Sequence, residues 1–267
     1  MYHKEQSVYQ SDSRKYPYRQ QVNVRAIRNA GRGCTAGEIN VSLKALIFDF
    51  DGVIADSEPC HLSAFNQTFA EFGIELDPVA YYEKYLGCTD YELIEDVQRD
   101  YKADFKGRTA KQLAEQKTEI FHELIGAGRS IIDGIIEFVA ELKKNNIRIA
   151  VNSGATAADI ELMLKGTKIE KAFEVIVTAD DIEKGKPDPQ GYLLTLKKLN
   201  DNSKDKISAG DCAVIEDSKW GIIAAQKAGM RTIGITNSYP AKELLGSDLI
   251  IDSVRHLTIS ALHKLCS

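Results

Sequence analysis

Apolar positions recur along this chain with two spacings, and the two spacings predict two kinds of element. From residue 132 onward, short runs of apolar residues alternate with stretches in which apolar residues return every three or four positions. The first pattern is typical of buried strands and the second of amphipathic helices. Repeated strand–helix units predict an α/β fold with a doubly wound, mainly parallel sheet and helices on both faces. The expected strands are Leu46–Phe48, Ile147–Asn152, Phe173–Thr178, Cys212–Ile215, Thr232–Ile235 and Leu249–Ile251, and the expected helices are Ile132–Asn145, Thr156–Lys165, Gln190–Leu199, Lys219–Ala228 and Val254–Leu265.

The stretch between about residues 60 and 128 shows the helical spacing alone. After Pro59, which suits the first turn of a helix, large apolar residues follow at three- and four-residue steps as far as Phe72. Further helices are expected at Val79–Tyr85, Asp90–Tyr101 and Ala110–Ile125. An all-helical insertion after a first strand resembles a cap. We therefore expect an α/β catalytic core made of residues 42–58 and 129–267, and a helical cap at residues 59–128.

Residues 1–41 differ from the rest of the chain. They carry seven basic residues against three acidic ones, and they lack a sustained apolar period. We expect a disordered basic arm here. The arm has no apolar stretch of the kind found in secretory signals, so a cytoplasmic location is expected, with an organelle transit peptide as the alternative.

Composition narrows the possible partners. The formal net charge of −5 gives no support to nucleic-acid binding, and no apolar run approaches the length of a membrane span. The five cysteines are scattered and never spaced as C-x-x-C, which argues against a disulfide framework and against a zinc site. We expect no nucleic-acid and no membrane partner, and a monomer by default.

The first expected strand ends in two carboxylates. Leu46–Phe48 is followed by Asp49, Phe50, Asp51 and Gly52. Side chains alternate along a strand, so the two aspartates are expected on the same side, where they repel. A divalent metal or a proton kept on one of them would relieve the repulsion. The alternative is an ordinary turn, because Asp and Gly are common turn residues.

Two further motifs follow later strands. Ser153 and Gly154 come after the second strand and open a helix, where a hydroxyl and free N–H groups suit a phosphate; the alternative is a serine that caps the helix. Lys186 lies between Gly185 and Pro187, which indicates a positioned ammonium group that could neutralise a phosphoryl oxygen or a carboxylate. Its alternative is a charged surface loop.

An acidic pair, Glu216 and Asp217, ends the fourth apolar strand. Buried carboxylates are costly unless a cation lies beside them. Together with Asp49 they would form an all-oxygen site suited to Mg²⁺. The alternative is that the acidic pair caps the helix that begins near Ser218.

Taken together and in this order, these motifs resemble those of the haloacid dehalogenase-like hydrolase superfamily. The resemblance covers about residues 43–265 and implies a Rossmann-like core with an inserted helical cap. Residues 56–59, His61 and the helical block resemble the β-phosphoglucomutase-like branch. The four matching stretches are Phe48–Ile54, Asn152–Ser153, Lys186–Pro187 and Ile215–Ser218.

The resemblance implies a role for each candidate residue. Asp49 would be the nucleophile that forms an aspartyl-phosphate, and Asp51 the general acid and base. Ser153, neighbouring N–H groups such as that of Gly154, and Lys186 would hold phosphoryl oxygens. Magnesium would be held by Asp49, the carbonyl of Asp51, Glu216 and Asp217. The substrate would be a small phosphorylated metabolite such as a sugar phosphate.

The same resemblance leaves two enzymatic readings open. The mutase pattern carries an arginine at the start of a cap helix, to bind the second phosphate of a bisphosphate, and this chain carries Asp90 there. A carboxylate cannot perform that role, so a phosphatase is favoured. His61 keeps the mutase possibility open, because in that branch a histidine at this place helps couple cap closure to the acid/base aspartate. Similar phosphatases also carry a histidine here, and the alternative is an ordinary polar residue on the first cap helix. His61 is also a candidate residue for binding the substrate or its phosphate. A metal-free dehalogenase would not need Asp51, Glu216 or Asp217. A non-catalytic binding or regulatory protein would be expected to have lost one of Asp49, Asp51, Lys186 and Asp217, and all four are present.

Overall fold

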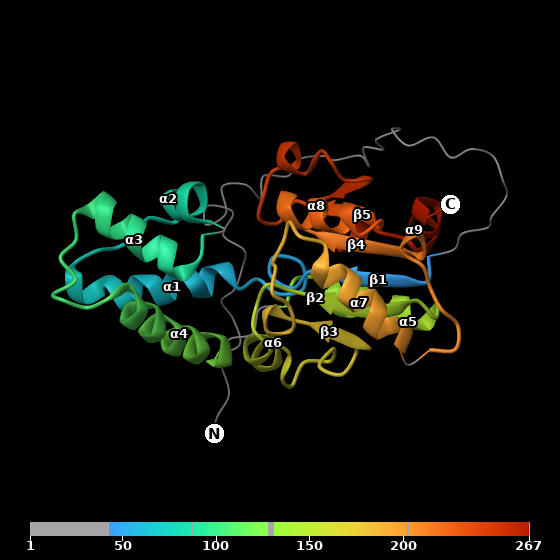
Figure 1. The fold of residues 1–267 in the computed structure, drawn as a ribbon, viewed down its shortest axis with the longest axis horizontal. Helices are drawn as coiled ribbons and strands as arrows, with labels where there is room; N and C mark the ends of the chain where they lie inside the picture. The colour runs from blue at the N-terminus through green and yellow to red at the C-terminus, as the bar shows by residue number, and fades with distance from the viewer. Residues whose placement is uncertain (1–42, 87, 128–130, 202, 267) are drawn as a thin grey trace, which may run out of the picture. The chain divides into compact units, whose positions relative to one another are not determined.

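The computed structural model describes residues 43–86, 88–127, 131–201 and 203–266. The arm expected at residues 1–41 lies outside the described residues. A six-stranded, wholly parallel sheet has the strand order β3-β2-β1-β4-β5-β6 (Figure 1). The strands are β1 (Ala45–Phe48), β2 (Arg148–Asn152), β3 (Val175–Val177), β4 (Cys212–Glu216), β5 (Arg231–Ile235) and β6 (Leu249–Ile251).

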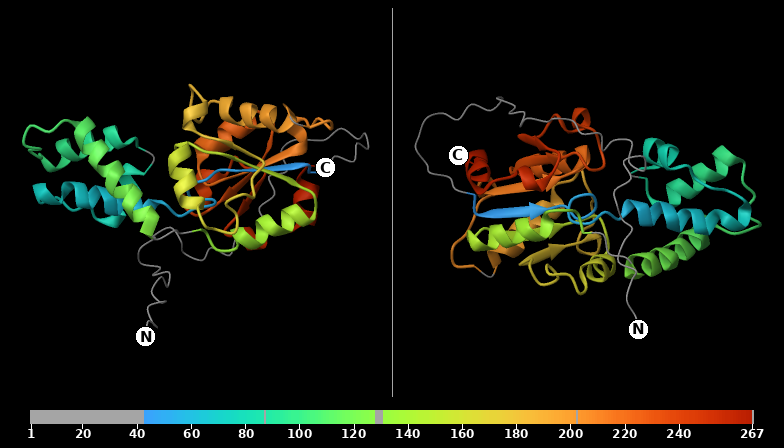
Figure 2. Two further views of the ribbon diagram at one scale, coloured as in Figure 1. Left: turned by 90° about the horizontal axis from the view of Figure 1, so that it is seen from below. Right: turned by 180° about the vertical axis from the view of Figure 1, so that it is seen from behind.

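Helices cover both faces of this sheet (Figure 2). On one face, Ile47 and Val214 point into a core that α7 and α8 complete with Tyr192, Leu199 and Ala225. On the other face α5 packs on β2 and α9 on β4, and the ring of Phe48 meets that of Phe138 edge to face. The Rossmann-like, doubly wound class predicted from the sequence is therefore confirmed. The helices of this part are α5 (Ile135–Lys144), α6 (Ala157–Leu164), α7 (Gln190–Asp201), α8 (Lys219–Lys227) and α9 (Ile259–Cys266).

A separate compact unit, Cys60–Phe121, contains helices and no strand among its described residues. Its core is rich in aromatic rings: Phe69 stacks on Phe65 and on Phe105. The helix α3 begins with a capping box in which Thr89 and Glu92 bind each other's backbone N–H groups. The described part of the α/β unit is 43–59, 122–127, 131–201 and 203–266. The helices are α1 (Glu58–Phe69), α2 (Pro78–Ala80), α3 (Asp90–Tyr101) and α4 (Ala110–Ala127), whose last turns belong to the α/β unit.

The helix expected at Val79–Tyr85 is divided into α2 and a π-helical turn, Tyr81–Tyr85. In the α/β unit two expected helices differ from the observed ones, and backbone conformation explains both. The helix expected at Ile132–Asn145 begins at Ile135, because Gly134 adopts a φ of 86°, outside the helical region. The helix expected at Val254–Leu265 is divided into a short 3₁₀ turn, Val254–His256, and α9. The extended backbone of Leu257 separates them. Among the described residues, no helix has both the length and the apolar character that a membrane crossing requires.

Candidate active site

Strand β1 ends in a buried carboxylate. The strand pairs with β2 on one side and β4 on the other, and all four of its residues are buried. Asp49 follows directly, and its N–H donates to the carbonyl of Ile215 at 2.9 Å, which continues the pairing with β4. Its side chain lies at the carboxyl edge of the sheet, where the strand order reverses between β1 and β4. Ligands of open α/β sheets bind at such a switch point.

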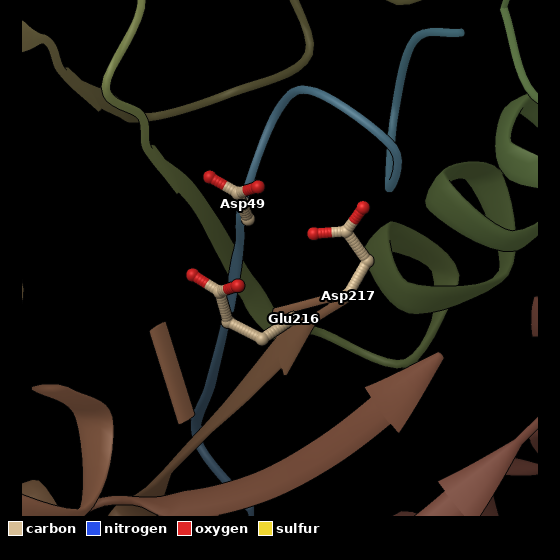
Figure 3. Close-up of side chains that lie close together, drawn as sticks. All are labelled: Asp49, Glu216 and Asp217. Atoms are coloured by element: carbon tan, nitrogen blue, oxygen red, sulfur yellow. The ribbon is translucent and has the colours of Figure 1, made fainter. Parts of the chain in front are cut away.

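Two more carboxylates come from the end of β4. Glu216 is the last residue of this strand and Asp217 the next, and both are buried. One oxygen from each of Asp49, Glu216 and Asp217 lies within 4.8 Å of the others (Figure 3). Burial, together with the neighbouring carboxylates, raises the pKa of Asp49 to about 7 and the pKa of Asp217 well above its ordinary range. The three groups cannot all stay ionised at low cost without additional positive charge.

Lys186 supplies one positive charge to this cluster. Its Nζ lies 2.5 Å from Asp49 Oδ1 and 2.5 Å from Glu216 Oε1, and it also donates to the carbonyl of Asn152 at 3.3 Å. Burial alone would lower the pKa of Lys186, but Asp49 and Glu216 outweigh burial and raise that pKa well above its ordinary value. The side chain is only 19% exposed, so the alternative of a solvated surface loop is wrong. Lys186 is a fixed cation beside two of the three carboxylates.

Asp51 is held apart from the cluster. Its Oδ1 accepts a hydrogen bond of 2.5 Å from the hydroxyl of Ser57. Burial raises the pKa of Asp51, and hydrogen bonds from the Ser57 and Ser153 hydroxyls partly oppose that rise. The two aspartates that begin the site thus have different surroundings: Asp49 contacts Lys186 and lies near two other carboxylates, whereas Asp51 contacts hydroxyl groups. A pair of like groups in unlike surroundings can divide acid–base work between them.

Gly52 allows the turn after Asp51 to pack against the acidic cluster. Its φ is +72°, a conformation that favours glycine, and its N–H donates to the carbonyl of Ala55 at 2.8 Å. A Cβ at this position would lie 1.8 Å from Asp217 Oδ2. The interpretation of Asp49 to Gly52 as no more than an ordinary turn is therefore too limited, because the turn is built against Asp217.

Ser153 and Gly154 follow β2. Ser153 is 1% exposed, and its hydroxyl accepts a hydrogen bond of 2.9 Å from the N–H of Ala155. The helix α6 is capped by Thr156, so the alternative that Ser153 is the helix cap is wrong. Gly154 is exposed, and a Cβ there would meet nothing within 4 Å. Ser153 thus hydrogen-bonds Asp51, and the backbone of the next residue, Gly154, is exposed.

Glu216 is bound at both carboxylate oxygens. Oε1 accepts from the Tyr192 hydroxyl at 2.6 Å, and Oε2 accepts from the Ser218 hydroxyl at 3.1 Å. Ser218 is the cap of α8 through the N–H of Gly221, so the acidic pair is not the helix cap and that alternative is wrong. A Cβ at Gly221 would lie 1.8 Å from the Glu216 carboxylate. Close packing therefore fixes the orientation of Glu216.

The helical unit contains His61 in a buried polar cluster of its own. His61 Nδ1 lies 2.8 Å from Lys117 Nζ, and the His61 ring stacks on Phe121 with centroids 4.0 Å apart. Lys117 also donates to both oxygens of Asp90 at 2.9 Å and is itself 2% exposed. Burial, and then the charge of Lys117, lower the pKa of His61 well below its ordinary value. His61 is therefore neutral at physiological pH.

Sequence reasoning missed four residues of these two clusters. A signal existed for Lys117, because Leu113, Lys117 and Phe121 share one helix face at four-residue steps and a lysine on an apolar face needs a partner. Tyr192 reads as an ordinary core aromatic. Asn237 donates from Nδ2 to the carbonyl of Gly52 at 2.7 Å, and Ser238 hydrogen-bonds Asp217, but both lie in a polar loop with no distinguishing pattern.

The acidic cluster fits a hard divalent cation. Its donors are all carboxylate oxygens, which Mg²⁺ prefers over nitrogen or sulfur. Lys186 pairs with Asp49 and Glu216, and the raised pKa values of Asp49 and Asp217 indicate uncompensated negative charge. The side chain of Asp51 is not among the three clustered carboxylates.

Comparison with known proteins agrees with this geometry. A family model described as haloacid dehalogenase-like hydrolase matches residues 46–235. This stretch contains Asp49, Asp51, Ser153, Lys186, Glu216 and Asp217. This chain belongs to the haloacid dehalogenase-like hydrolase family. The membership confirms the resemblance read from the motifs.

Individual relatives place this hydrolase in the β-phosphoglucomutase-like branch. It is 31% identical to β-phosphoglucomutase of Bacillus subtilis over 83% of this chain and 95% of that protein. It is 31% identical to the phosphorylated carbohydrates phosphatase of Thermotoga maritima over 73% of this chain and 87% of that protein. A solved structure of a CbbY mutant from Rhodobacter sphaeroides, in complex with xylulose-(1,5)bisphosphate, superposes with a TM-score of 0.68 at 30% identity, over 80% of this chain and 96% of that chain. Relatives named as phosphatases support the expectation of a phosphomonoester hydrolase.

Proposed function

We propose that this hydrolase is a magnesium-dependent phosphatase that acts on a small phosphorylated metabolite, most simply a sugar phosphate, through an aspartyl-phosphate on Asp49. The observation that carries the proposal is the unlike surroundings of Asp49 and Asp51: the first contacts Lys186 and the acidic pair, and the second contacts Ser57. The relatives named as acting on sugar phosphates and phosphorylated carbohydrates support the substrate class.

The reaction divides into two displacements at phosphorus. In the first, an Asp49 oxygen attacks phosphorus and the bond to the leaving oxygen breaks, while Asp51 gives that oxygen its proton. In the second, Asp51 takes a proton from water, the water oxygen attacks the same phosphorus, and the Asp49 carboxylate is released with inorganic phosphate. The raised pKa of Asp51 suits a group that must carry a proton at the start of the cycle.

The other residues bind and neutralise the transferred group. Lys186, already fixed beside Asp49, would balance charge on the phosphoryl oxygens, and the hydroxyl of Ser153 with the backbone of Gly154 would donate to them. Asp49, the Asp51 carbonyl, Glu216 and Asp217 would hold Mg²⁺. The ion would lower the repulsion between an anionic nucleophile and an anionic phosphate. His61 remains a candidate substrate-binding residue of the helical unit.

A sugar-phosphate mutase is the second candidate, and Asp90 argues against it. In the mutase pattern this position carries a cation for a second phosphate. Here it carries a carboxylate, and both of its oxygens are bound by Lys117 at 2.9 Å. The charge of Lys117 is therefore neutralised by Asp90, and this pair does not provide a cation that could bind the second phosphate of a bisphosphate. The remaining candidate, a non-catalytic phosphometabolite-binding or regulatory protein, would have no need for a complete set of Asp49, Asp51, Lys186 and Asp217.

Phosphate release separates these candidates. A panel of phosphorylated metabolites is incubated with the enzyme, with Mg²⁺ and with EDTA, and includes β-glucose 1-phosphate with a trace of glucose 1,6-bisphosphate. Magnesium-dependent release of inorganic phosphate from one or a few sugar phosphates is expected. Formation of glucose 6-phosphate without phosphate release would identify a mutase instead, and binding without any turnover would identify a non-catalytic protein.

A further inference from the structure

The loop that follows β5 touches the candidate site at two points. Asn237 donates from its side-chain amide to the carbonyl of Gly52 at 2.7 Å, across 185 residues of sequence. Ser238, the next residue, hydrogen-bonds Asp217. A Cβ at Gly52 would lie 2.6 Å from the Ser238 hydroxyl, so the loop packs directly against the turn that follows Asp51. None of the roles described above uses these two side chains.

Asn237 completes the fixation of Gly52. The N–H of Gly52 is bound by the carbonyl of Ala55 at 2.8 Å, and its carbonyl is bound by Asn237. Both peptide groups that flank this residue are thereby oriented. Glycine has the largest conformational freedom of any residue, so a turn with a glycine next to Asp51 needs external contacts to hold one conformation. Ser57 fixes the Asp51 carboxylate, and Asn237 fixes the backbone next to it.

We propose that Asn237 is a positioning residue for the acid–base function of Asp51. The inference rests on the proposed phosphatase function, and it adds a residue from a different strand end to the machinery. Asn237 does not touch the phosphoryl group in this proposal; it acts through the turn that carries Asp51. Displacement of a catalytic group by about 1 Å can lower a rate by about a hundredfold, so loss of this contact has a measurable effect.

The role of Asp51 as an acid gives this proposal a distinctive readout. A sugar phosphate releases an alkoxide, which needs a proton as it leaves, whereas 4-nitrophenyl phosphate releases a stable phenolate that does not. The ratio kcat/KM reports the first displacement, in which the leaving group departs. A misplaced Asp51 therefore lowers kcat/KM for the sugar phosphate much more than for 4-nitrophenyl phosphate. Damage to the metal site or to the fold lowers both.

The test compares Asn237→Ala and Asn237→Leu with Asn200→Ala in the full chain. Leucine keeps the approximate volume of the side chain but cannot donate. Asn200 is a matched control, because its amide also binds backbone groups of another segment, the N–H and carbonyl of Ile207 at 2.9 Å each. The probes are 4-nitrophenyl phosphate and the sugar phosphate of the panel above for which the wild-type enzyme has the highest kcat/KM, both with saturating Mg²⁺, and melting temperatures are measured in parallel.

Both Asn237 variants are expected to lose about 10- to 100-fold in kcat/KM with the sugar phosphate and less than about threefold with 4-nitrophenyl phosphate. Their melting temperatures are expected to match that of Asn200→Ala, which keeps wild-type activity on both probes. Equal losses on the two probes, no loss on either, or unfolding of both Asn237 variants would overturn the positioning role. A wild-type enzyme that releases phosphate from no sugar phosphate of the panel would overturn the proposed function, and this inference with it.

Discussion

The hydroxyl of Tyr192 donates a hydrogen bond of 2.6 Å to Glu216 Oε1 inside the sheet–helix core. Both side chains are completely buried. Burial, together with the charge of Glu216, raises the pKa of Tyr192 well above its ordinary value, so the phenol keeps its proton and remains a donor throughout the working pH range. A residue from α7 thus orients a carboxylate from β4 that the sequence assigns to a metal site.

Replacement of Tyr192 by phenylalanine leaves Glu216 with one donor fewer. The Tyr192→Phe enzyme is expected to lose about 1–3 kcal/mol of unfolding free energy, because a buried charged acceptor gives up a hydrogen bond. Urea denaturation measures the change. Tyr101→Phe is the control, since Tyr101 is 44% exposed and its replacement should cost less than about 0.5 kcal/mol. Similar losses in the two variants would show that the buried contact contributes little.

Asp49→Asn removes the proposed nucleophile and keeps the shape of the side chain. Phosphate release is expected to fall by at least about a thousandfold, because no aspartyl-phosphate can form. The circular dichroism spectrum and the sheet should remain those of the native enzyme. Retention of most of the activity by a folded Asp49→Asn enzyme would mean that another group attacks phosphorus.

The raised pKa of Asp49 predicts a pH-dependent stability in the absence of metal. Its folded-state pKa is about 7, against an ordinary value of 3.8, so between these pH values the native state keeps a proton that the unfolded chain releases. The unfolding free energy contributed by this group therefore falls as the pH rises from about 4 to about 7. Urea denaturation in EDTA at several pH values measures the decline.

Two comparisons assign that decline to Asp49. The Asp49→Asn variant should show a smaller loss of stability over the same pH range, because the neutral amide does not titrate. Mg²⁺ should restore stability to the wild-type protein above pH 7 by binding the ionised carboxylates. A wild-type curve that rises in parallel with that of Asp49→Asn would contradict the assignment.

Asp217→Asn is expected to weaken metal binding. The concentration of Mg²⁺ needed for half-maximal activity should rise by at least about tenfold, because a ligand oxygen loses its charge. Binding of Mn²⁺, followed by electron paramagnetic resonance, gives a readout that does not depend on turnover. Asp252→Asn is the control, because Asp252 follows β6 and pairs with His256, and it should leave both measurements unchanged. An unaltered metal requirement in Asp217→Asn would remove this residue from the site.

The Asp90–Lys117 pair offers a test within the helical unit. Asp90→Ala should destabilise the protein by about 1–3 kcal/mol, because it leaves the ammonium of Lys117 buried without its carboxylate. The double variant Asp90→Ala/Lys117→Met should recover most of that loss, since no charge then remains unpaired. Thermal denaturation measures each step, and a double variant less stable than Asp90→Ala would contradict the pairing.

Asp90→Arg tests the mutase argument on the same position. It places a cation where the mutase pattern has one, and it also puts that cation beside Lys117. Affinity for glucose 1,6-bisphosphate, measured as competitive inhibition of phosphate release, should increase if Asp90 is what excludes a second phosphate. No gain in affinity from a folded variant would leave the exclusion of bisphosphates to other residues.

The parts of the molecule that could be predicted are those whose signal lies within a few consecutive residues of the sequence. The strand β1 was foreseen because a buried parallel strand is a continuous apolar run, and Asp49 because a carboxylate follows such a run directly. Lys186 was foreseen from the glycine and proline around it. The boundaries of the core and cap expected at residues 58/59 and 128/129 stay a prediction.

Contacts between distant segments escaped sequence reasoning for a physical reason. Tyr192 lies on the apolar face of α7, where the sequence predicts an ordinary core aromatic. Its hydroxyl has a role only because Glu216 of another segment accepts its hydrogen bond. Asn237 has the composition of any polar loop, and its role depends on the carbonyl of Gly52. The division of the helix expected at Val254–Leu265 was missed because no proline or glycine marks the extended backbone at Leu257.

The neighbouring strands β1 and β2 pair in parallel, residue for residue from Ala45 and Arg148, although the helical unit Cys60–Phe121 comes between them in the chain. The insertion therefore lies within the crossover connection between β1 and β2. The register of the sheet is set by the pairing of the strands and not by the insertion. Changes of length or sequence within the insertion need not disturb the residues that do the chemistry.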